Sequence, residues 1–207
     1  MDVSFSLEEL KNYLMEDIQD IKTFEDLVNL EAALDREIFL GDIVSGTGSA
    51  IDGVIRYWNR KDNENNIPIE ERKPIKIYID STGGYLSDTF SIIDAIKMSK
   101  TPIITICTGE ALSGGFFIFI SGHKRYAYPH ASFLFHEGST ETSGTSSQFE
   151  NYSAFYKRKL GQLKDIILEN TNISEKEYTE IKKDDIWYDT NDGIKKGFID
   201  EVIEELI

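Results

Sequence analysis

Apolar residues recur at helical spacing at the start of the chain. Leu7, Leu10 and Leu14 lie three or four positions apart, and a second apolar series with the same spacing follows Thr23. Residues at this spacing share one face of a helix, which is the pattern of an amphipathic helix. We therefore expect residues 1–35 to form a helical N-terminal segment.

From residue 36 onward, short apolar runs alternate with longer amphipathic stretches. The runs that predict strands are Glu37–Val44, Ile75–Ile79, Pro102–Cys107, Phe133–Phe135 and Phe198–Ile203. The stretches that predict helices are Ser49–Arg60, Ser87–Met98, Ala111–Ile120, Ser146–Asn170, Ser174–Lys183 and Asp189–Lys196. This alternation is typical of an α/β fold with right-handed crossovers, and we expect one such domain over residues 36–207. The polar residues 61–73 predict a loop.

Acidic residues outnumber basic ones, 37 to 22, which gives the 207-residue chain a net charge of −15. Such a surface repels phosphate groups, and so we expect neither a nucleic acid nor a membrane as a partner. Cys107 is the only cysteine, which excludes an internal disulfide and a cysteine-rich zinc site. The first residues lack a secretory signal, and the most apolar run, Gly114–Ile120, is far too short to span a bilayer. We therefore expect a cytoplasmic protein.

Two glycine-rich turns follow predicted strands and precede predicted helices. They are Asp80–Gly84 and Gly109–Gly115. Such turns at the carboxyl ends of parallel strands can carry a site, although a single turn of this kind is more often only a tight connection. Neither turn has the glycine spacing of a nucleotide-binding loop, which disfavours phosphate binding.

Ser113 stands where the predicted apolar helix begins and where backbone N–H groups lack partners within the helix. The N–H of Gly114 is one such group, and Gly84 in the neighbouring turn is a candidate for a second. Two convergent N–H groups beside a serine make an oxyanion hole, which stabilises the transition state of acyl transfer. The pattern therefore indicates a serine nucleophile, and this nucleophile needs a base.

The chain has three histidines that are candidates for the base. His123 and His130 lie in a polar segment, and we interpret them as solvated loop residues. His136 follows the apolar run 133–135, a position that suits either a catalytic base or a structural residue at a strand end. A carboxylate must orient the imidazole, and Asp185 is one candidate among many.

The order of these motifs resembles that of the proteolytic subunit of the Clp protease (ClpP), a serine peptidase family. Ile79–Gly84 looks like the family's Asn-Ser-Pro-Gly-Gly motif, and Gly109–Gly115 is similar to its Gly-x-Ala-Ala-Ser-Met-Gly nucleophile motif. Pro129–His136 resembles its Pro-Asn-Ser-x-x-x-x-His base motif, and Asp185–Asp200 follows its downstream run in order and register. The likeness covers residues 37–203.

The resemblance implies a role for each matching residue. Ser113 would be the nucleophile, His136 the general base and Asp185 the residue that orients the imidazole. The backbone N–H groups of Gly84 and Gly114 would form the oxyanion hole. The implied activity is that of a serine endopeptidase that cleaves unfolded polypeptides or peptides through an acyl-enzyme, with no metal or organic cofactor.

An architecture and partners are also implied by the resemblance. The fold would be the ClpP/crotonase-like superhelix of repeated ββα units, with residues 139–170 as a protruding handle of a strand and a helix. Gly83, Tyr85 and Leu86 would lie beside the substrate as an edge strand. Heptameric rings, stacked as a tetradecamer, would be fed by an ATPase unfoldase of the AAA+ class.

Three residues depart from the family's motifs. Thr82 replaces a proline, which we expect to loosen the turn beside the oxyanion hole. Gly114 replaces a bulkier methionine, which we expect to widen the pocket nearby. Asp184 stands where the family commonly has an arginine that pairs across the contact between rings, and so this ion pair is lost.

Two other functions stay open. A catalytically silent ClpP-like subunit would only complete a mixed ring, but Ser113, His136 and Asp185 are all present, which disfavours this reading. A crotonase-like enzyme that acts on an acyl-CoA would share the paired oxyanion N–H groups. Those enzymes typically use carboxylates instead of a serine and a histidine.

Overall fold

A computed structural model describes residues 31–136, 138, 142–181 and 184–206 of the chain. The chain divides into two compact units after Asp35, and the second, larger unit runs from Arg36 to Ile207. Of the predicted helical segment 1–35, only residues 31–35 are described, and residues 31–34 are helical. The rest of that prediction lies outside the described residues.

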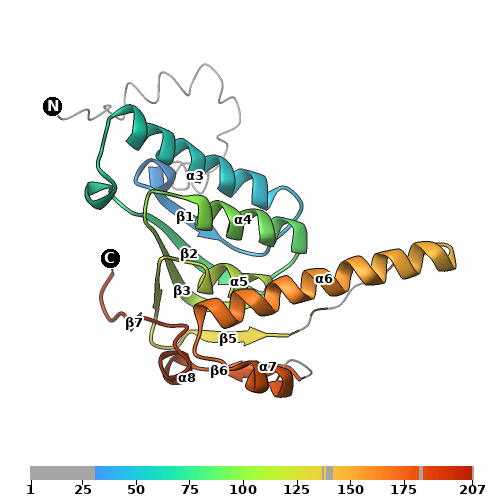
Figure 1. Cartoon of the computed structure of the whole chain (residues 1–207). Coiled ribbons are helices and arrows are strands. Elements are labelled where there is room, and N and C mark those ends of the chain that lie inside the picture. Colours follow the sequence, from blue (N-terminus) through green and yellow to red (C-terminus); the bar gives the residue numbers. More distant parts are fainter. Residues whose placement is uncertain (1–30, 137, 139–141, 182–183, 207) are drawn as a thin grey trace. The chain divides into compact units, whose positions relative to one another are not determined.

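One sheet of seven strands organises the unit from Arg36 onward (Figure 1). Its strands are β1 (Glu37–Leu40), β2 (Ile75–Ser81), β3 (Ile103–Leu112), β4 (Lys124–Ala127), β5 (Ser132–Phe135), β6 (Ile186–Tyr188) and β7 (Glu201–Val202). The order is β1-β2-β3-β4-β7, with β5 beside β3 and β6 beside β5. The described strand pairs are parallel except for β5 with β6. The mostly parallel sheet confirms the predicted α/β fold class.

Helices connect the strands and cover the sheet. They are α3 (Thr47–Glu64), α4 (Leu86–Met98), α5 (Gly114–Ile120), α6 (Ser146–Asn170), α7 (Glu175–Ile181) and α8 (Thr190–Lys195), with a short 3-10 turn η1 (Ile69–Glu71). Helices α3 and α4 pack against each other, and α5 packs on β3. Among the helices that the structure describes, none combines the length and the apolar character needed to cross a membrane.

Helix α6 extends well beyond the sheet as a long rod (Figure 1). It has the bounds predicted from the sequence, and it begins with a capping box in which Thr145 Oγ1 accepts a hydrogen bond from the N–H of Gln148. The predicted handle also included a strand before the helix. Residues 142–145 are not in a strand, and residues 139–141 lie outside the described part of the chain.

The long strand β3 pairs with two different strands along its length. Its first half pairs with β4, and its last residues pair with β5, where Leu112 lies beside Leu134. Because β3 and β5 run in the same direction, the residues that follow them emerge at the same edge of the sheet. This pairing therefore brings Ser113, which follows β3, close to His136, which follows β5.

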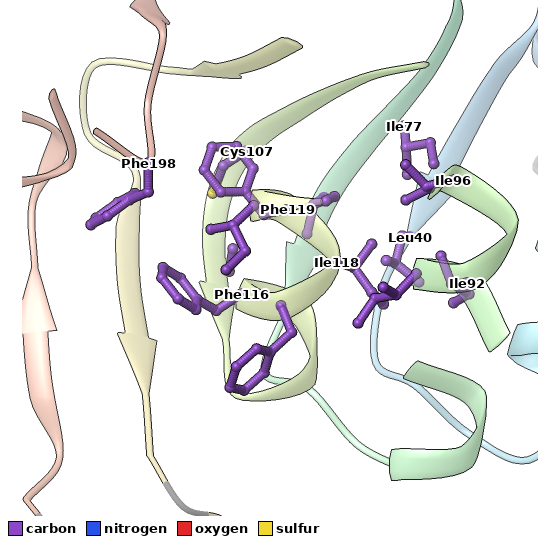
Figure 2. Packing of buried hydrophobic residues seen from close by; sticks show 14 of the residues in the cluster. Leu40, Ile77, Ile92, Ile96, Cys107, Phe116, Ile118, Phe119 and Phe198 are labelled. Atoms are coloured by element: carbon purple, nitrogen blue, oxygen red, sulfur yellow. The ribbon is translucent and has the colours of Figure 1, made fainter. Parts of the chain in front are cut away.

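Aromatic side chains around α5 form the centre of the core (Figure 2). All residues of α5 are buried, and the ring of Phe116 lies 5.3 Å from that of Phe198, while the ring of Phe119 lies 5.0 Å from that of Phe133. Full burial of a side chain of this size stabilises a fold by about 1.5–3 kcal/mol. The packing therefore holds α5, and with it the turn at residue 113, in a fixed position.

The predicted loop over residues 61–73 is wrong at its start, because α3 continues to Glu64. Asp62, on the last turn of this helix, is fully buried. Its two carboxylate oxygens accept hydrogen bonds from Arg36 Nη1 at 2.9 Å and Nη2 at 2.5 Å. An ion pair between residues so far apart in the sequence stabilises a helical turn that its polar composition disfavours.

Other differences concern short elements. Ala111 and Leu112 end β3 instead of starting the apolar helix, which begins at Gly114. Strand β4 lies in the polar segment that was interpreted as a loop, and β6 has only three residues. Neither strand contains an apolar run long enough to predict it, because each is held by pairing with its neighbours in the sheet.

Candidate active site

Ser113 occupies a strained turn between β3 and α5. Its backbone has φ 52° and ψ −119°, a conformation that a residue with a side chain rarely adopts. The turn is held from both sides, since the N–H of Ser113 donates to the C=O of Leu134 at 2.9 Å and its C=O accepts from the N–H of Phe116 at 3.1 Å. Strain of this kind costs about 1–3 kcal/mol and typically persists at functional sites.

His136 lies within hydrogen-bond distance of this serine. Its Nε2 is 3.0 Å from Ser113 Oγ, and the imidazole is about one-third exposed. A base must lie within this distance of the proton that it removes. The parallel pairing of β3 with β5 therefore produces the serine–histidine contact that the family resemblance implied.

Asp185 lies on the other side of the imidazole. Its Oδ1 is 3.6 Å from His136 Nδ1, which is longer than a hydrogen bond, and its side chain is 69% exposed. The residue directly precedes β6, and the antiparallel pairing of Ile186 with Phe135 brings it to this position. Ser113, His136 and Asp185 thus lie in a row, with a close first contact and a looser second one.

The other two histidines lie elsewhere. His123 and His130 are exposed, as predicted. His123 also has a structural contact that the sequence did not indicate, because its Nδ1 accepts a hydrogen bond from the N–H of Ile103 at 2.9 Å. Neither histidine is among the residues that line the pocket around Ser113.

The turn at Gly83 and Gly84 lies directly against Ser113. A Cβ atom at Gly83 would come within 2.7 Å of Ser113 Cβ, and one at Gly84 would come within 1.9 Å of the C=O oxygen of Ile43. Both glycines have positive φ angles, 104° and 145°. Only glycine allows this close approach.

Two backbone N–H groups are available beside Ser113. Within the described part of the chain, neither Gly84 nor Gly114 donates its N–H to a hydrogen bond. Gly114 is the first residue of α5, where the helix itself offers no acceptor. This is the arrangement of donors that an oxyanion requires.

The expectation that Gly114 widens the pocket is wrong. A Cβ atom at this position would lie 2.6 Å from Thr89 Oγ1 and 2.9 Å from Ile43 Cδ1. Thr89 and Ile43 therefore fill the space that the smaller residue leaves. The glycine allows α4 to pack closely against the start of α5.

Thr82 does not loosen its turn, contrary to expectation. Its N–H and its hydroxyl both donate to Asp42 Oδ1, at 2.9 and 2.6 Å. These hydrogen bonds favour the charged carboxylate and lower the pKa of Asp42. The threonine therefore anchors the glycine turn to the segment that follows β1.

The predicted substrate-binding strand is partly occupied by the protein itself. The C=O of Gly83 accepts from the N–H of Ile43 at 2.8 Å, and the N–H of Tyr85 donates to the C=O of Ile43 at 2.9 Å. In an extended chain, the backbone N–H and C=O groups of successive residues point alternately to the two edges of the strand. The backbone groups of Gly84 are left toward the open edge, whereas Leu86 already belongs to α4.

Ser113 and His136 line a hollow of about 940 Å³. The apolar and aromatic residues that line it are Ile43, Tyr85, Leu86, Phe90, Phe117, Tyr152, Phe155, Tyr156 and Leu163. A hollow of this size and character is typical of a site that takes an organic ligand. It would accommodate side chains of a peptide.

Sequence reasoning missed the contribution of α6 to this hollow. Tyr152, Tyr156, Lys159 and Leu163 lie three or four residues apart and so share one face of the helix. That spacing was a usable signal, but the alternating charges along the helix obscured it. Among the described residues, no three His, Cys, Asp or Glu side chains gather as a metal site would require.

The family model for Clp protease matches residues 67–206 of the chain. This range contains the two glycine turns, Ser113, His136 and Asp185. The chain belongs to the Clp protease family. The resemblance inferred from the motifs is thereby confirmed, and a ClpP-like protease is the general class of the protein.

Curated relatives agree with this membership. The chain is 29% identical over 177 residues to the ATP-dependent Clp protease proteolytic subunit 2 of Prochlorococcus marinus, with 82% of each chain covered. It is 31% identical over 136 residues to the protein of the same name from Chlamydia abortus, covering 65% of this chain and 66% of the relative. The subunit 2 of Rhodococcus jostii is 29% identical over 133 residues, 63% of this chain and 68% of the relative.

Proposed function

We propose that this Clp protease family member is a serine endopeptidase that cleaves peptides or unfolded polypeptides through an acyl-enzyme. The observation that carries the proposal is the 3.0 Å contact between Ser113 Oγ and His136 Nε2. It lies beside the available N–H groups of Gly84 and Gly114. A nucleophile, a base and paired oxyanion donors are the parts that acyl transfer needs.

In the first step, Ser113 Oγ attacks the carbonyl carbon of the scissile peptide bond while His136 Nε2 takes the hydroxyl proton. The N–H groups of Gly84 and Gly114 hold the negative oxygen of the tetrahedral intermediate. His136 then gives the proton to the leaving amine, and the acyl-enzyme forms. Water, deprotonated by the same imidazole, hydrolyses the ester and returns Ser113.

Asp185 would stabilise the imidazolium that forms in both steps. Its contact with His136 Nδ1, at 3.6 Å, must shorten to become a hydrogen bond. Because the carboxylate is largely exposed, the side chain of Asp185 has room for this movement. The looseness of this contact also favours a second candidate, a subunit that is silent by itself and becomes active only when a partner orders Asp185.

The substrate would bind as an extended strand beside the glycine turn. Pairing would use the backbone groups of Gly84, because the C=O of Gly83 and the N–H of Tyr85 already bond to Ile43 and Leu86 belongs to α4. One side chain of the substrate would then enter the hollow. This mode of binding adds a strand to an open edge.

Assembly and a feeding partner also belong to the proposal. Phe149 and Phe155, 57% and 46% exposed on the protruding helix α6, support contacts between rings of a homo-oligomer, with heptameric rings stacked as a tetradecamer. Phe39, 53% exposed and stacked on Tyr78, supports docking of a partner such as an AAA+ unfoldase. The cytoplasm is the location that fits this function.

An acyl-CoA enzyme is supported less well. None of the residues described as lining the hollow is Asp or Glu, whereas a serine and a histidine are both present. Acyl-CoA chemistry on this kind of fold typically uses carboxylates. The serine–histidine pair therefore favours peptide hydrolysis.

Labelling with a fluorophosphonate tests the function. We expect one adduct on the wild-type chain, detected by intact mass, and none on Ser113→Ala or His136→Ala. Ser132→Ala and His130→Ala, which change residues outside the hollow, should label like the wild type. An adduct that survives in Ser113→Ala would contradict a peptidase activated by this pair, and a wild-type chain that stays unlabelled would favour the subunit that is silent by itself.

A further inference from the structure

Lys159 is a cation in the wall of the hollow that Ser113 and His136 line. It lies on α6, four residues before the buried Leu163. Its Nζ is 4.5 Å from the centre of the Phe90 ring, a cation–π contact between α6 and α4. This contact holds the ammonium group at the hollow instead of leaving the side chain free in solvent.

The charge of Lys159 has no carboxylate partner among the described residues. Two other lysines in this region are paired, since Lys164 contacts Glu175 and Lys97 contacts Glu169. None of the described residues that line the hollow is acidic; besides Lys159, the titratable side chains described there are His136 and three tyrosines. Lys159 thus combines a position in a largely apolar hollow with the absence of a carboxylate partner in the described part of the chain.

We propose that Lys159 selects a substrate with an acidic side chain, glutamate above all, at the position that fills this hollow; the proposal rests on the proposed peptidase function. The methylene groups of glutamate would pack against Phe90 and Leu163. Its carboxylate would reach the ammonium group beside apolar side chains, where a charged hydrogen bond is stronger than in open water. A lysine at the same position would meet a like charge.

Binding measurements test this selection without any hydrolysis. A neutral fluorescent peptide is varied at the residue before the scissile bond, with glutamate, glutamine, leucine or lysine there, and is titrated with the Ser113→Ala chain. One charged hydrogen bond corresponds to about tenfold in affinity. We expect the glutamate peptide to bind about tenfold more tightly than the glutamine peptide, which has the same shape.

Substitutions on α6 decide whether Lys159 causes the preference. Adding Lys159→Met should bring the ratio of the two affinities near one, whereas Lys157→Met, an exposed lysine outside the hollow, should leave it unchanged. Lys159→Glu should reverse the preference, so that the lysine peptide binds more tightly than the glutamate peptide. This gain with a different peptide excludes misfolding as the cause.

The labelling and binding experiments together distinguish a failure of this inference from a failure of the proposed function. A chain that labels with fluorophosphonate at Ser113 but shows no preference dependent on Lys159 overturns the selection and keeps the peptidase. A chain that does not label, yet keeps the preference dependent on Lys159, overturns the peptidase and supports an acidic-peptide site. Equal affinity for the glutamate and glutamine peptides in the Ser113→Ala chain overturns the selection.

Discussion

Replacing Asp62 by asparagine would test the buried ion pair that joins α3 to the start of β1. Asp62 is fully buried and accepts hydrogen bonds from both terminal nitrogens of Arg36 and, at 2.7 Å, from Thr101 Oγ1. The side chain of Arg36 is only 9% exposed, and its guanidinium also lies 4.4 Å from the centre of the Trp58 ring. It cannot turn to solvent when the negative charge is removed.

Asparagine keeps the size of the side chain but leaves the guanidinium without a counter-charge. Removing one partner of a buried ion pair costs about 3–5 kcal/mol. A domain is stable by about 5–15 kcal/mol in all, so Asp62→Asn should lower the free energy of unfolding by a large fraction. Urea unfolding followed by circular dichroism measures this loss, at one protein concentration because assembly would add to stability.

Two further variants make this prediction refutable. Asp52→Asn removes the partner of Arg56 in an ion pair at the surface of the same helix, and its midpoint should change little. Replacing both partners, with Arg36→Met and Asp62→Leu, should recover most of the lost stability, because no unpaired charge stays buried. If Asp62→Asn unfolds at the same urea concentration as Asp52→Asn, the reasoning is wrong.

Two other predictions concern the site and the core. Gly83→Ala should abolish fluorophosphonate labelling, because the new methyl group would lie 2.7 Å from Ser113 Cβ. Gly53→Ala, whose methyl group would have no other atom within 4 Å, should label normally. Equal labelling of the two variants would refute the argument from close approach. The buried hydroxyl of Tyr188 has no hydrogen-bond partner among the described residues, and burial raises its pKa to about 12. Below about pH 10 the phenol is neutral in both states, so its ionisation does not affect stability; as the pH rises from about 10 toward 12 only the unfolded chain ionises, and stability falls. Tyr188→Phe should retain or raise stability at pH 7 and should reduce the alkaline loss, to which Tyr78 also contributes because its pKa is raised to about 12 as well. Urea unfolding across pH measures both effects, and a large loss at pH 7 would contradict the prediction.

The sequence by itself determined the elements whose own composition specifies them. The alternation of apolar runs with amphipathic stretches predicted the α/β class, and α6 has the predicted bounds because its capping residues and charge pattern are local. The glycine turns and the order of Ser113, His136 and Asp185 were also readable. These features depend on backbone freedom and side-chain chemistry, which are properties of residues close together in the chain.

Tertiary structure alone decided the features that depend on distant partners. The last turn of α3 forms because Asp62 meets Arg36, and β4 and β6 form because neighbouring strands offer hydrogen bonds. In the same way, Thr89 and Ile43 fill the space beside Gly114, and Lys159 of α6 enters the wall of the hollow next to Ser113. No local pattern specifies such contacts, because the free energy that stabilises them comes from groups brought together only when the chain has folded.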